Sequence, residues 1–262
     1  MVLMRGQNSI HADMLASGFR GLRSPGQARL SAELRKYIDE LFGSSCNCAE
    51  GPYSFGQSHY CAEQLAKGVT GKRALVASTY RSSVEPLLQH YGIRTRWLDL
   101  VDNVWIALWF ACYRQEMSGR HAFHIRRSPA QEGNDASVYI AVMESGPLSS
   151  TSIPGYLVGP ESRVVDLRYS VPSVYLRPHA QHALLMAPRN LSTADGSLAS
   201  LVTAYLEIRL VDALDWLGVG VMTSAHVLFP PAAVDEGFRR LLDHAPIPDQ
   251  LLGSICLFGP AA

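Results

Sequence analysis

One stretch of the sequence places a dense polar block directly in front of an apolar helix, and this stretch most constrains the fold. The block covers residues 88–99 and contains two arginines, a histidine, a tyrosine and an aspartate. Residues 104–113 follow and are apolar on almost every side, which predicts a helix that is buried all round. Buried polar groups without partners cost about 1–3 kcal/mol each, so the block is either a functional site or a dense internal network.

The local pattern of this stretch predicts a strand, a turn and a helix start. Residues 95–100 alternate in polarity, as a half-buried strand does. The apolar helix is expected to begin at Asp102 or Asn103, because both side chains can cap free backbone N–H groups. A helix N-terminus favours negative charge, so Arg94 and Arg96 beside it predict a site for an anionic ligand.

The same stretch resembles the FRG domain family. Members of that family carry an Arg-Gly-Gln near their start, a Gln-His-Tyr-Gly-x-x-Thr-Arg-x-Leu-Asp block and an Ala-Leu-x-Phe-Ala helix. The three motifs lie here at residues 5–7, 89–99 and 107–111, and Phe19-Arg20-Gly21 is a second candidate for the opening motif. The distance from the start of the chain favours Arg5 as the site residue. The sequence departs from the family at Arg94, where proline is commonest. The resemblance implies that residues 1–262 form a single FRG-type α+β domain.

The remaining periodicity predicts helices first and a sheet later. Helices are expected at residues 27–43, 59–67, 82–91, 212–217 and 234–244. Strands are expected at residues 1–4, 137–143, 164–167, 174–176, 183–188 and 201–210. Residues 114–135 are expected to be a polar linker that is interrupted at residues 121–125, and residues 146–159 are expected to be a mobile loop. We therefore predict a single α+β domain whose N-terminal helices pack on a mixed, mainly antiparallel sheet.

Composition excludes several classes of function. The 23 Lys and Arg balance the 23 Asp and Glu, so no overall charge favours nucleic acid or an anionic membrane. No run approaches the roughly 18 apolar residues of a membrane span, and no signal-peptide pattern opens the chain. Five cysteines without a secretion signal predict a reducing, cytoplasmic location.

The sequence offers one weak metal-binding pattern. Cys46, Cys48, His59 and Cys61 carry suitable atoms for zinc, but the C-x-C spacing lacks the two-residue gap of ordinary zinc knuckles. Free thiols in a loop are the simpler interpretation, and we expect no metal. Nucleophile elbows, Walker loops and metalloprotease helices are also absent from the sequence.

Three polar positions are similar in order to those of ADP-ribosyltransferases. Those enzymes carry an arginine or histidine on an early strand, then a polar strand followed by an Ala-x-x-Phe helix. A Glu or Gln then leads into an apolar strand. Arg5, residues 97–111 and Gln181 occupy these three places. The resemblance implies an ADP-ribosyltransferase-like fold with NAD as its substrate.

The resemblance also implies roles for individual residues. Cleavage of NAD passes through an oxocarbenium-like centre, an arginine can bind the pyrophosphate through two N–H groups, and an aromatic ring can stack on nicotinamide. The residues expected to bind NAD are Arg5, Gly6, Gln7, Tyr91, Thr95 and Arg96. The residues expected to act in catalysis are His90, Asp99 and Gln181. Because a glutamine cannot be a base, activation of an acceptor falls to His90, His182 or Asp99.

The sequence thus favours an NAD-using ADP-ribosyltransferase or NAD glycohydrolase, of the toxin or effector type, with an unknown macromolecular acceptor. A non-catalytic FRG module that binds a nucleotide or a protein partner is the alternative, and a purely structural polar network is the third interpretation. We expect Arg5, Gln181 and either Arg96 or Asp99 to surround one cleft. We also expect the Asp99 carboxylate to pair with Arg96 or Arg5.

Overall fold

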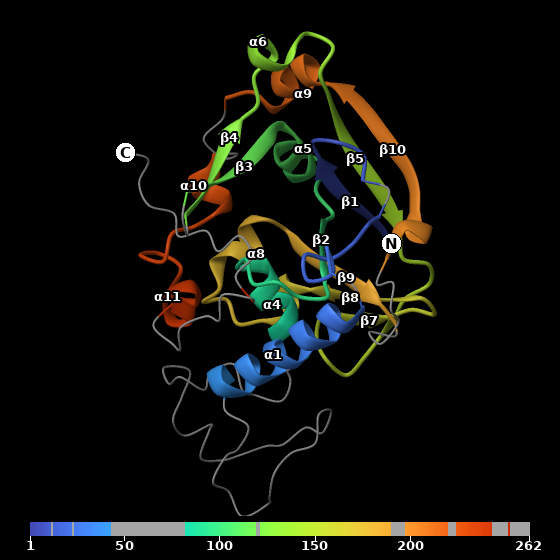
Figure 1. Cartoon of the computed structure of the whole chain (residues 1–262), viewed down its shortest axis with the longest axis vertical. Coiled ribbons are helices and arrows are strands. Elements are labelled where there is room, and N and C mark those ends of the chain that lie inside the picture. The colour runs from blue at the N-terminus through green and yellow to red at the C-terminus, as the bar shows by residue number, and fades with distance from the viewer. Residues whose placement is uncertain are drawn as a thin grey trace, which may run out of the picture.

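An antiparallel sheet of eight strands runs through the part of the chain that the computed structural model describes (Figure 1). That part comprises residues 1–11, 13–22, 24–42, 82–118, 121–189, 197–219, 224–242 and 251. The strands of the sheet are β1 (Val2–Gln7), β2 (Leu98–Val101), β5 (Ser137–Glu144), β6 (Ser149–Ser150), β7 (Tyr156–Val158), β8 (Ser162–Asp166), β9 (Ala183–Pro188) and β10 (Val202–Arg209). Their order is β10-β5-β1-β2-β9-β8-β7-β6.

Helices cover this sheet in two groups. The described helices are α1 (Ser24–Phe42), α4 (Val84–His90), α5 (Val104–Cys112), α6 (Pro129–Glu132), α7 (Leu167–Ser170), α8 (Leu176–Ala180), α9 (Leu210–Leu217), α10 (Ala225–Leu228) and α11 (Glu236–Leu242), with a 3-10 turn at Ala199–Leu201. One core joins α1, α4 and α11 to β8 and β9, and a second joins α5 and α9 to β5. The predicted α+β class with a mainly antiparallel sheet is confirmed.

The two best-defined helices form for the reasons that the sequence indicates. In α1 the side chains of Leu30, Leu34 and Ile38 recur along one face, and all three are buried. In α5 most side chains are buried, as expected for a helix without a polar face. Of the two possible caps, Asn103 is the one used, because its side chain accepts hydrogen bonds from the main-chain nitrogens of residues 105 and 106.

The sheet divides between β1 and β2. Strand β1 pairs with β5 along its whole length, but with β2 only through Met4 and Val101. Figure 1 shows the half with β10, β5 and β1 turned relative to the half with β9, β8 and β7. The strands therefore separate beyond Met4 and Val101, where Arg5 on β1 and Asp99 on β2 follow.

Several predictions of local structure are wrong. The expected linker over residues 114–135 contains a hairpin of β3 (Tyr113–Ser118) and β4 (His121–Arg126), followed by α6. The expected loop over residues 146–159 contains β6 and β7. The expected strand at residues 174–176 is absent from this described segment, because the chain turns there into α8. These elements are too short, or too exposed, to show a clear hydrophobic period.

Other predictions are met with shifted ends or lie outside the described residues. The first strand extends through Arg5, Gly6 and Gln7, and the strand expected over residues 95–100 begins only at Leu98. The helix expected at residues 59–67 and the cysteine-rich segment before it lie outside the described residues. Among the described residues, no group of His, Cys, Asp and Glu is placed to hold a metal ion. No helix within the described ranges has the length and apolarity of a membrane span.

Gly6 is needed where β1 crosses α5. A Cβ atom built on Gly6 would lie 1.8 Å from the Ala107 carbonyl oxygen and 2.8 Å from the Ala111 nitrogen. Both neighbours are backbone atoms of α5, so they cannot move away as a flexible side chain would. The glycine thus permits direct contact between the central strand and the buried helix.

We predict that Gly6→Ala separates β1 from α5 and lowers the free energy of unfolding by at least about 1–3 kcal/mol. Gly26→Ala in α1 is the matched control, because its new Cβ would meet only the Leu22 side chain, at 3.4 Å. The control should leave stability unchanged or raise it by up to about 1 kcal/mol. Urea denaturation followed by circular dichroism measures both. Equal stability of the two variants would contradict the close contact.

Candidate functional site

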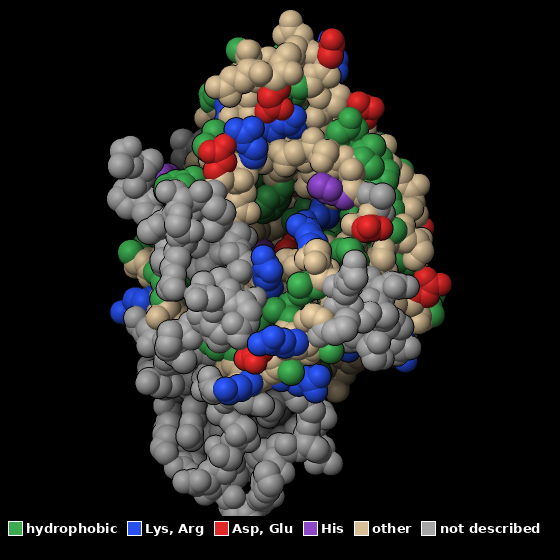
Figure 2. Space-filling model, in the orientation of Figure 1, with side chains coloured by type: hydrophobic (Ala, Val, Ile, Leu, Met, Phe, Trp, Pro, Cys, Tyr) green, Lys and Arg blue, Asp and Glu red, His purple; other side chains and the backbone are tan. Residues whose placement is uncertain are grey.

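A cleft of about 340 Å³ opens where β1 and β2 separate, between α4 and α5. Figure 2 shows a hollow on this face of the molecule, with basic and histidine side chains around it. The lining contains three arginines, three histidines and three aromatic residues: Arg5, Arg20, Arg177, His11, His90, His124, Phe110, Tyr113 and Phe229. Asp99 is the only carboxylate among the described residues that line it.

The charge of the cleft is positive at neutral pH. Burial lowers the pKa of Arg5 to about 10, and the charge of Arg20 acts in the same direction, yet Arg5 stays protonated at pH 7. Burial and the neighbouring arginines also lower the pKa of His11, and burial with the charge of Arg177 lowers that of His124 to about 4. Both imidazoles are therefore largely neutral, and three guanidinium groups face one carboxylate. This balance suits an anionic ligand.

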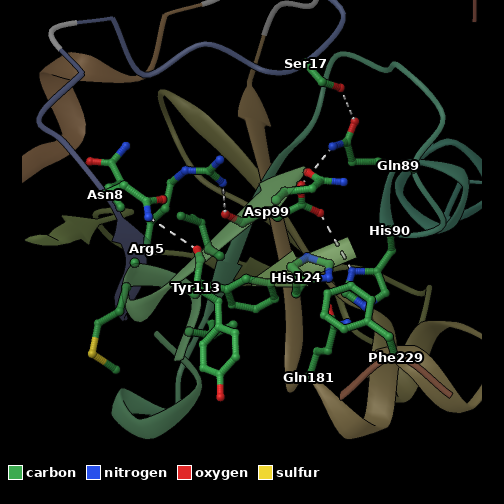
Figure 3. Close-up of a pocket in the computed structure, with 18 of the residues that line it drawn as sticks. Arg5, Asn8, Ser17, Gln89, His90, Asp99, Tyr113, His124, Gln181 and Phe229 are labelled. Atoms are coloured by element: carbon green, nitrogen blue, oxygen red, sulfur yellow. Dashed lines mark hydrogen bonds and ion pairs between the residues drawn. The ribbon is translucent and has the colours of Figure 1, made fainter. Parts of the chain in front are cut away.

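Arg5 bridges the gap between the separating strands. Its Nη1 donates a hydrogen bond of 2.6 Å to the main-chain oxygen of Asp99 (Figure 3). The guanidinium thus supplies a donor to a carbonyl at the point where β1 and β2 have ceased to pair. The predicted ion pair between the Asp99 carboxylate and Arg96 or Arg5 is wrong, because Arg5 bonds the main chain and Arg96 points elsewhere.

The Asp99 carboxylate lies beside the side chains of Gln89 and His90 instead. Its Oδ2 accepts a hydrogen bond of 2.8 Å from Gln89 Nε2, and its Oδ1 lies 3.7 Å from His90 Nδ1. Burial alone would raise the pKa of Asp99. The His90 imidazole, the charge of Arg5 and the Gln89 amide outweigh burial and hold that pKa below its ordinary value. Asp99 is therefore ionised at neutral pH.

His90 lines the cleft beside Asp99. Its side chain is only 5% exposed. Its Nδ1 faces Asp99, whereas its Nε2 is buried and has no hydrogen-bond partner among the described residues. A buried polar atom without a partner is unusual and marks a position where a ligand could supply one.

Gln181 closes the cleft from the side of β9. Its side chain is 3% exposed, and its Nε2 donates a hydrogen bond of 2.6 Å to the main-chain oxygen of Leu228. This bond ties the entry into β9 to the segment that carries Phe229, whose ring stacks on His124 with centroids 4.2 Å apart. The Gln181 amide nitrogen is thus engaged in structure while the residue lines the cleft.

Six of the nine predicted site residues line the cleft. They are Arg5, Gly6, Gln7, His90, Asp99 and Gln181. Gly6 is there for a different reason from the one expected, because its missing side chain makes room for α5 and not for a ligand. Gln7 is buried, and its Nε2 lies 3.5 Å from Met14 Sδ.

The other three predicted residues are not among the residues that line the cleft. Arg96 forms two hydrogen bonds with Glu85, of 3.0 Å from Nε and 2.6 Å from Nη2. The Tyr91 hydroxyl donates to the buried Asp235 carboxylate at 2.6 Å. Thr95 is fully buried, and its hydroxyl donates to Gln89 Oε1 at 2.9 Å. These side chains hold the polar block in place behind the cleft wall.

His182, considered as an alternative base, also lies outside the lining. Its Nδ1 lies 3.2 Å from Asp102 Oδ1 and 3.1 Å from Arg168 Nη1. Arg168 in turn bonds the Asp166 carboxylate, so His182 belongs to a separate, partly exposed ion network. Because His182 is not among the lining residues, His90 is the candidate base that lies beside Asp99 in the cleft.

The sequence interpretation missed several residues of the cleft. Arg177 is buried, and its guanidinium lies over the rings of Tyr91 and Phe238, at 4.6 Å from each centroid. No periodicity marks such a residue, because its setting depends on segments far apart in the chain. Gln89 lay inside the recognised block but received no role, and Ser17 and Arg20 come from a segment to which the sequence analysis assigned no site residue.

Comparison with known proteins gives one match. Residues 5–120 match the family model of the FRG domain, which confirms the resemblance found in the sequence over that range. No curated protein and no solved structure matches the chain. The matched range includes Arg5, the polar block and α5, whereas Arg177, Gln181 and Phe229 lie beyond it.

The lowered pKa of Asp99 gives a stability prediction with a definite sign. Because the folded-state pKa lies below the ordinary 3.8, the contribution of Asp99 is present above that pH and is lost as the pH falls through the folded value. Asp99→Asn should therefore be less stable than wild type at about pH 6, and the difference should shrink near about pH 3. Urea denaturation at both pH values tests this. A constant difference would mean that the carboxylate is not stabilised by its neighbours.

Proposed function

Residues 5–120 match the family model of the FRG domain, and from this premise we propose that the cleft binds NAD and cleaves its nicotinamide–ribose bond. The protein would act as an ADP-ribosyltransferase or as an NAD glycohydrolase. One observation carries the proposal. Arg5 on β1, Asp99 on β2 and Gln181 at the entry to β9 line one cleft, and these three strands are neighbours in the sheet.

The cationic lining supports binding of the pyrophosphate. Arg5 and Arg20 lie close enough for their charges to interact, and both line the cleft. A guanidinium offers five N–H donors, and Arg5 uses its Nη1 on the Asp99 carbonyl. Its other donors suit two phosphate oxygens in a planar fork. The rings of Tyr113 and Phe229 provide an apolar wall for a stacked base or nicotinamide.

The single carboxylate supports a role in bond cleavage. When the bond between ribose C1′ and the nicotinamide nitrogen breaks, its electron pair leaves with nicotinamide and positive charge develops on the ribose. An ionised Asp99 near that centre would stabilise the charge. A hydroxyl, amine or water then forms a bond to C1′ and gives its proton to His90 or Asp99. We include a macromolecular acceptor, a cytoplasmic location and a toxin or effector role in this proposal.

The alternative is a non-catalytic FRG module that binds a nucleotide or a protein partner. Gln181 favours this alternative, because an amide is no base and its nitrogen already bonds Leu228. The described lining also contains no glutamate. Binding and cleavage therefore need separate measurements.

We predict that wild type binds NAD and releases nicotinamide, more strongly when a cell lysate supplies acceptors. Arg5→Lys keeps the charge but loses the planar fork, so it should weaken binding, and Arg5→Ala should weaken it about 10- to 100-fold. Asp99→Asn should still bind NAD but lose release of nicotinamide. Calorimetric titration with NAD and ADP-ribose and chromatography of nicotinamide provide the two readouts.

Arg209→Ala is the matched control. Arg209 lies at the end of the edge strand β10, pairs with Asp212 and does not line the cleft. It should bind and cleave NAD as wild type does. Binding by wild type without release of nicotinamide would favour the non-catalytic module. The absence of NAD and ADP-ribose binding by folded wild type would reject NAD cleavage, and it would leave only a module for another nucleotide or a protein partner.

A further inference from the structure

The side-chain amide of Gln89 connects four groups at the cleft. Figure 3 shows its bonds to Ser17 and Asp99. Its oxygen accepts hydrogen bonds from Ser17 Oγ at 2.7 Å, from Thr95 Oγ1 at 2.9 Å and from the Thr95 main-chain nitrogen at 3.3 Å. Its nitrogen donates to Asp99 Oδ2 at 2.8 Å. One amide therefore links a loop near the N-terminus, the polar block and the carboxylate of the cleft.

Only one orientation of this amide satisfies its neighbours. The main-chain N–H of Thr95 is always a donor, so the amide oxygen must face it. The ionised Asp99 carboxylate is always an acceptor, so the NH₂ group must face that side. Rotation of the amide by half a turn would set donor against donor and oxygen against carboxylate. The hydrogen bond to Asp99 thus has a fixed direction.

The fold holds in place the groups of Ser17 and Thr95 that donate hydrogen bonds to Gln89. The Gly18 main-chain nitrogen donates to the Thr95 carbonyl at 2.8 Å, which ties the loop that carries Ser17 to the polar block. A Cβ atom on Gly18 would lie 2.5 Å from the same carbonyl oxygen, so a larger residue would push the loop away. The orientation of Gln89 therefore depends on close contact between segments about 75 residues apart in sequence.

The orientation of Asp99 determines which nitrogen of His90 is basic. With Oδ2 engaged by Gln89, the other oxygen, Oδ1, has no hydrogen-bond partner among the described residues and lies 3.7 Å from His90 Nδ1. A carboxylate on that side favours the proton on Nδ1 and leaves the lone pair on Nε2. That Nε2 is buried in the wall of the cleft, without a hydrogen-bond partner among the described residues.

We infer that Gln89 is a positioning residue, which holds Asp99 against His90 and so makes His90 Nε2 the proton acceptor of the reaction. The last step rests on the proposed function. As the acceptor attacks ribose C1′, its O–H or N–H bond breaks and the proton moves to Nε2. Nicotinamide leaves with the electrons of the glycosidic bond, and Asp99 stabilises the imidazolium that forms. Neither Gln89 nor Ser17 touches the reacting atoms.

The first experiment measures the protonation of Asp99 and the tautomer of His90 in the absence of any substrate. We expect Gln89→Met to raise the pKa of the Asp99 carboxyl group, measured by ¹³C NMR titration. It should also convert His90 from the Nδ1–H tautomer to a mixture, measured from ¹⁵N shifts. Gln131→Met, on the exposed helix α6, is the matched control and should change neither property. A folded Gln89→Met protein with unchanged Asp99 and His90 signals would overturn the inference.

Ser17→Ala keeps the test decisive if Gln89→Met does not fold. This variant removes one of the donors to Gln89 and leaves the amide in place, so the same two signals should shift in the same direction by less. Unchanged signals in a folded Ser17→Ala protein would then overturn the inference. Circular dichroism and the melting temperature report folding for every variant.

The second experiment separates this inference from the proposed function. If wild type cleaves NAD, Gln89→Met should lower kcat roughly 10- to 100-fold with KM almost unchanged, as the loss of an orienting partner commonly does. Gln131→Met should keep the wild-type kcat. Unchanged kcat in Gln89→Met would overturn the positioning role. If wild type does not cleave NAD, the proposed function fails, while the NMR titration still decides whether Gln89 orients Asp99 and His90.

Discussion

The separation of β1 from β2 is the constraint on which the rest of the structure depends. The two strands pair only through Met4 and Val101, and beyond that point Arg5 replaces the missing strand partner by bonding the Asp99 carbonyl. A buried carbonyl must find a donor, so the guanidinium both closes the sheet and remains at the edge of the cleft. The same split divides the helices into one layer around α4 and another around α5.

The polar block is both a site and a structural network, and different residues serve each purpose. His90 and Asp99 face the cleft, whereas Arg96 and Tyr91 satisfy the buried or half-buried carboxylates of Glu85 and Asp235. Removing one partner of such a pair would leave an uncompensated charge in the interior. These internal pairs hold α4 against the start of β2, so that the Asp99 carboxylate and the His90 imidazole lie side by side at the cleft.

Prediction from sequence succeeded where one periodicity dominated a long segment. The helices α1 and α5 have clear amphipathic or wholly apolar patterns, and β5 and β9 are continuous apolar strands. It failed for β3 and β4, whose alternating residues include many polar side chains in an exposed hairpin. It failed also for the partner of Asp99. The expected ion pair with Arg96 or Arg5 rested on opposite charge alone, and the sequence does not show in which direction each side chain points.

By itself, the sequence determined the α+β class, the FRG-type block, a helix cap at Asp102 or Asn103, and the presence of Arg5, Asp99 and Gln181 near strand ends. Only the tertiary structure decided that these three share a cleft and that Gln89, Ser17 and Arg177 belong beside them. The physical reason is that local hydrogen bonding and hydrophobic period act over a few residues. The partners of a buried polar group are chosen instead by chain packing, which brings together donors and acceptors separated by many tens of residues.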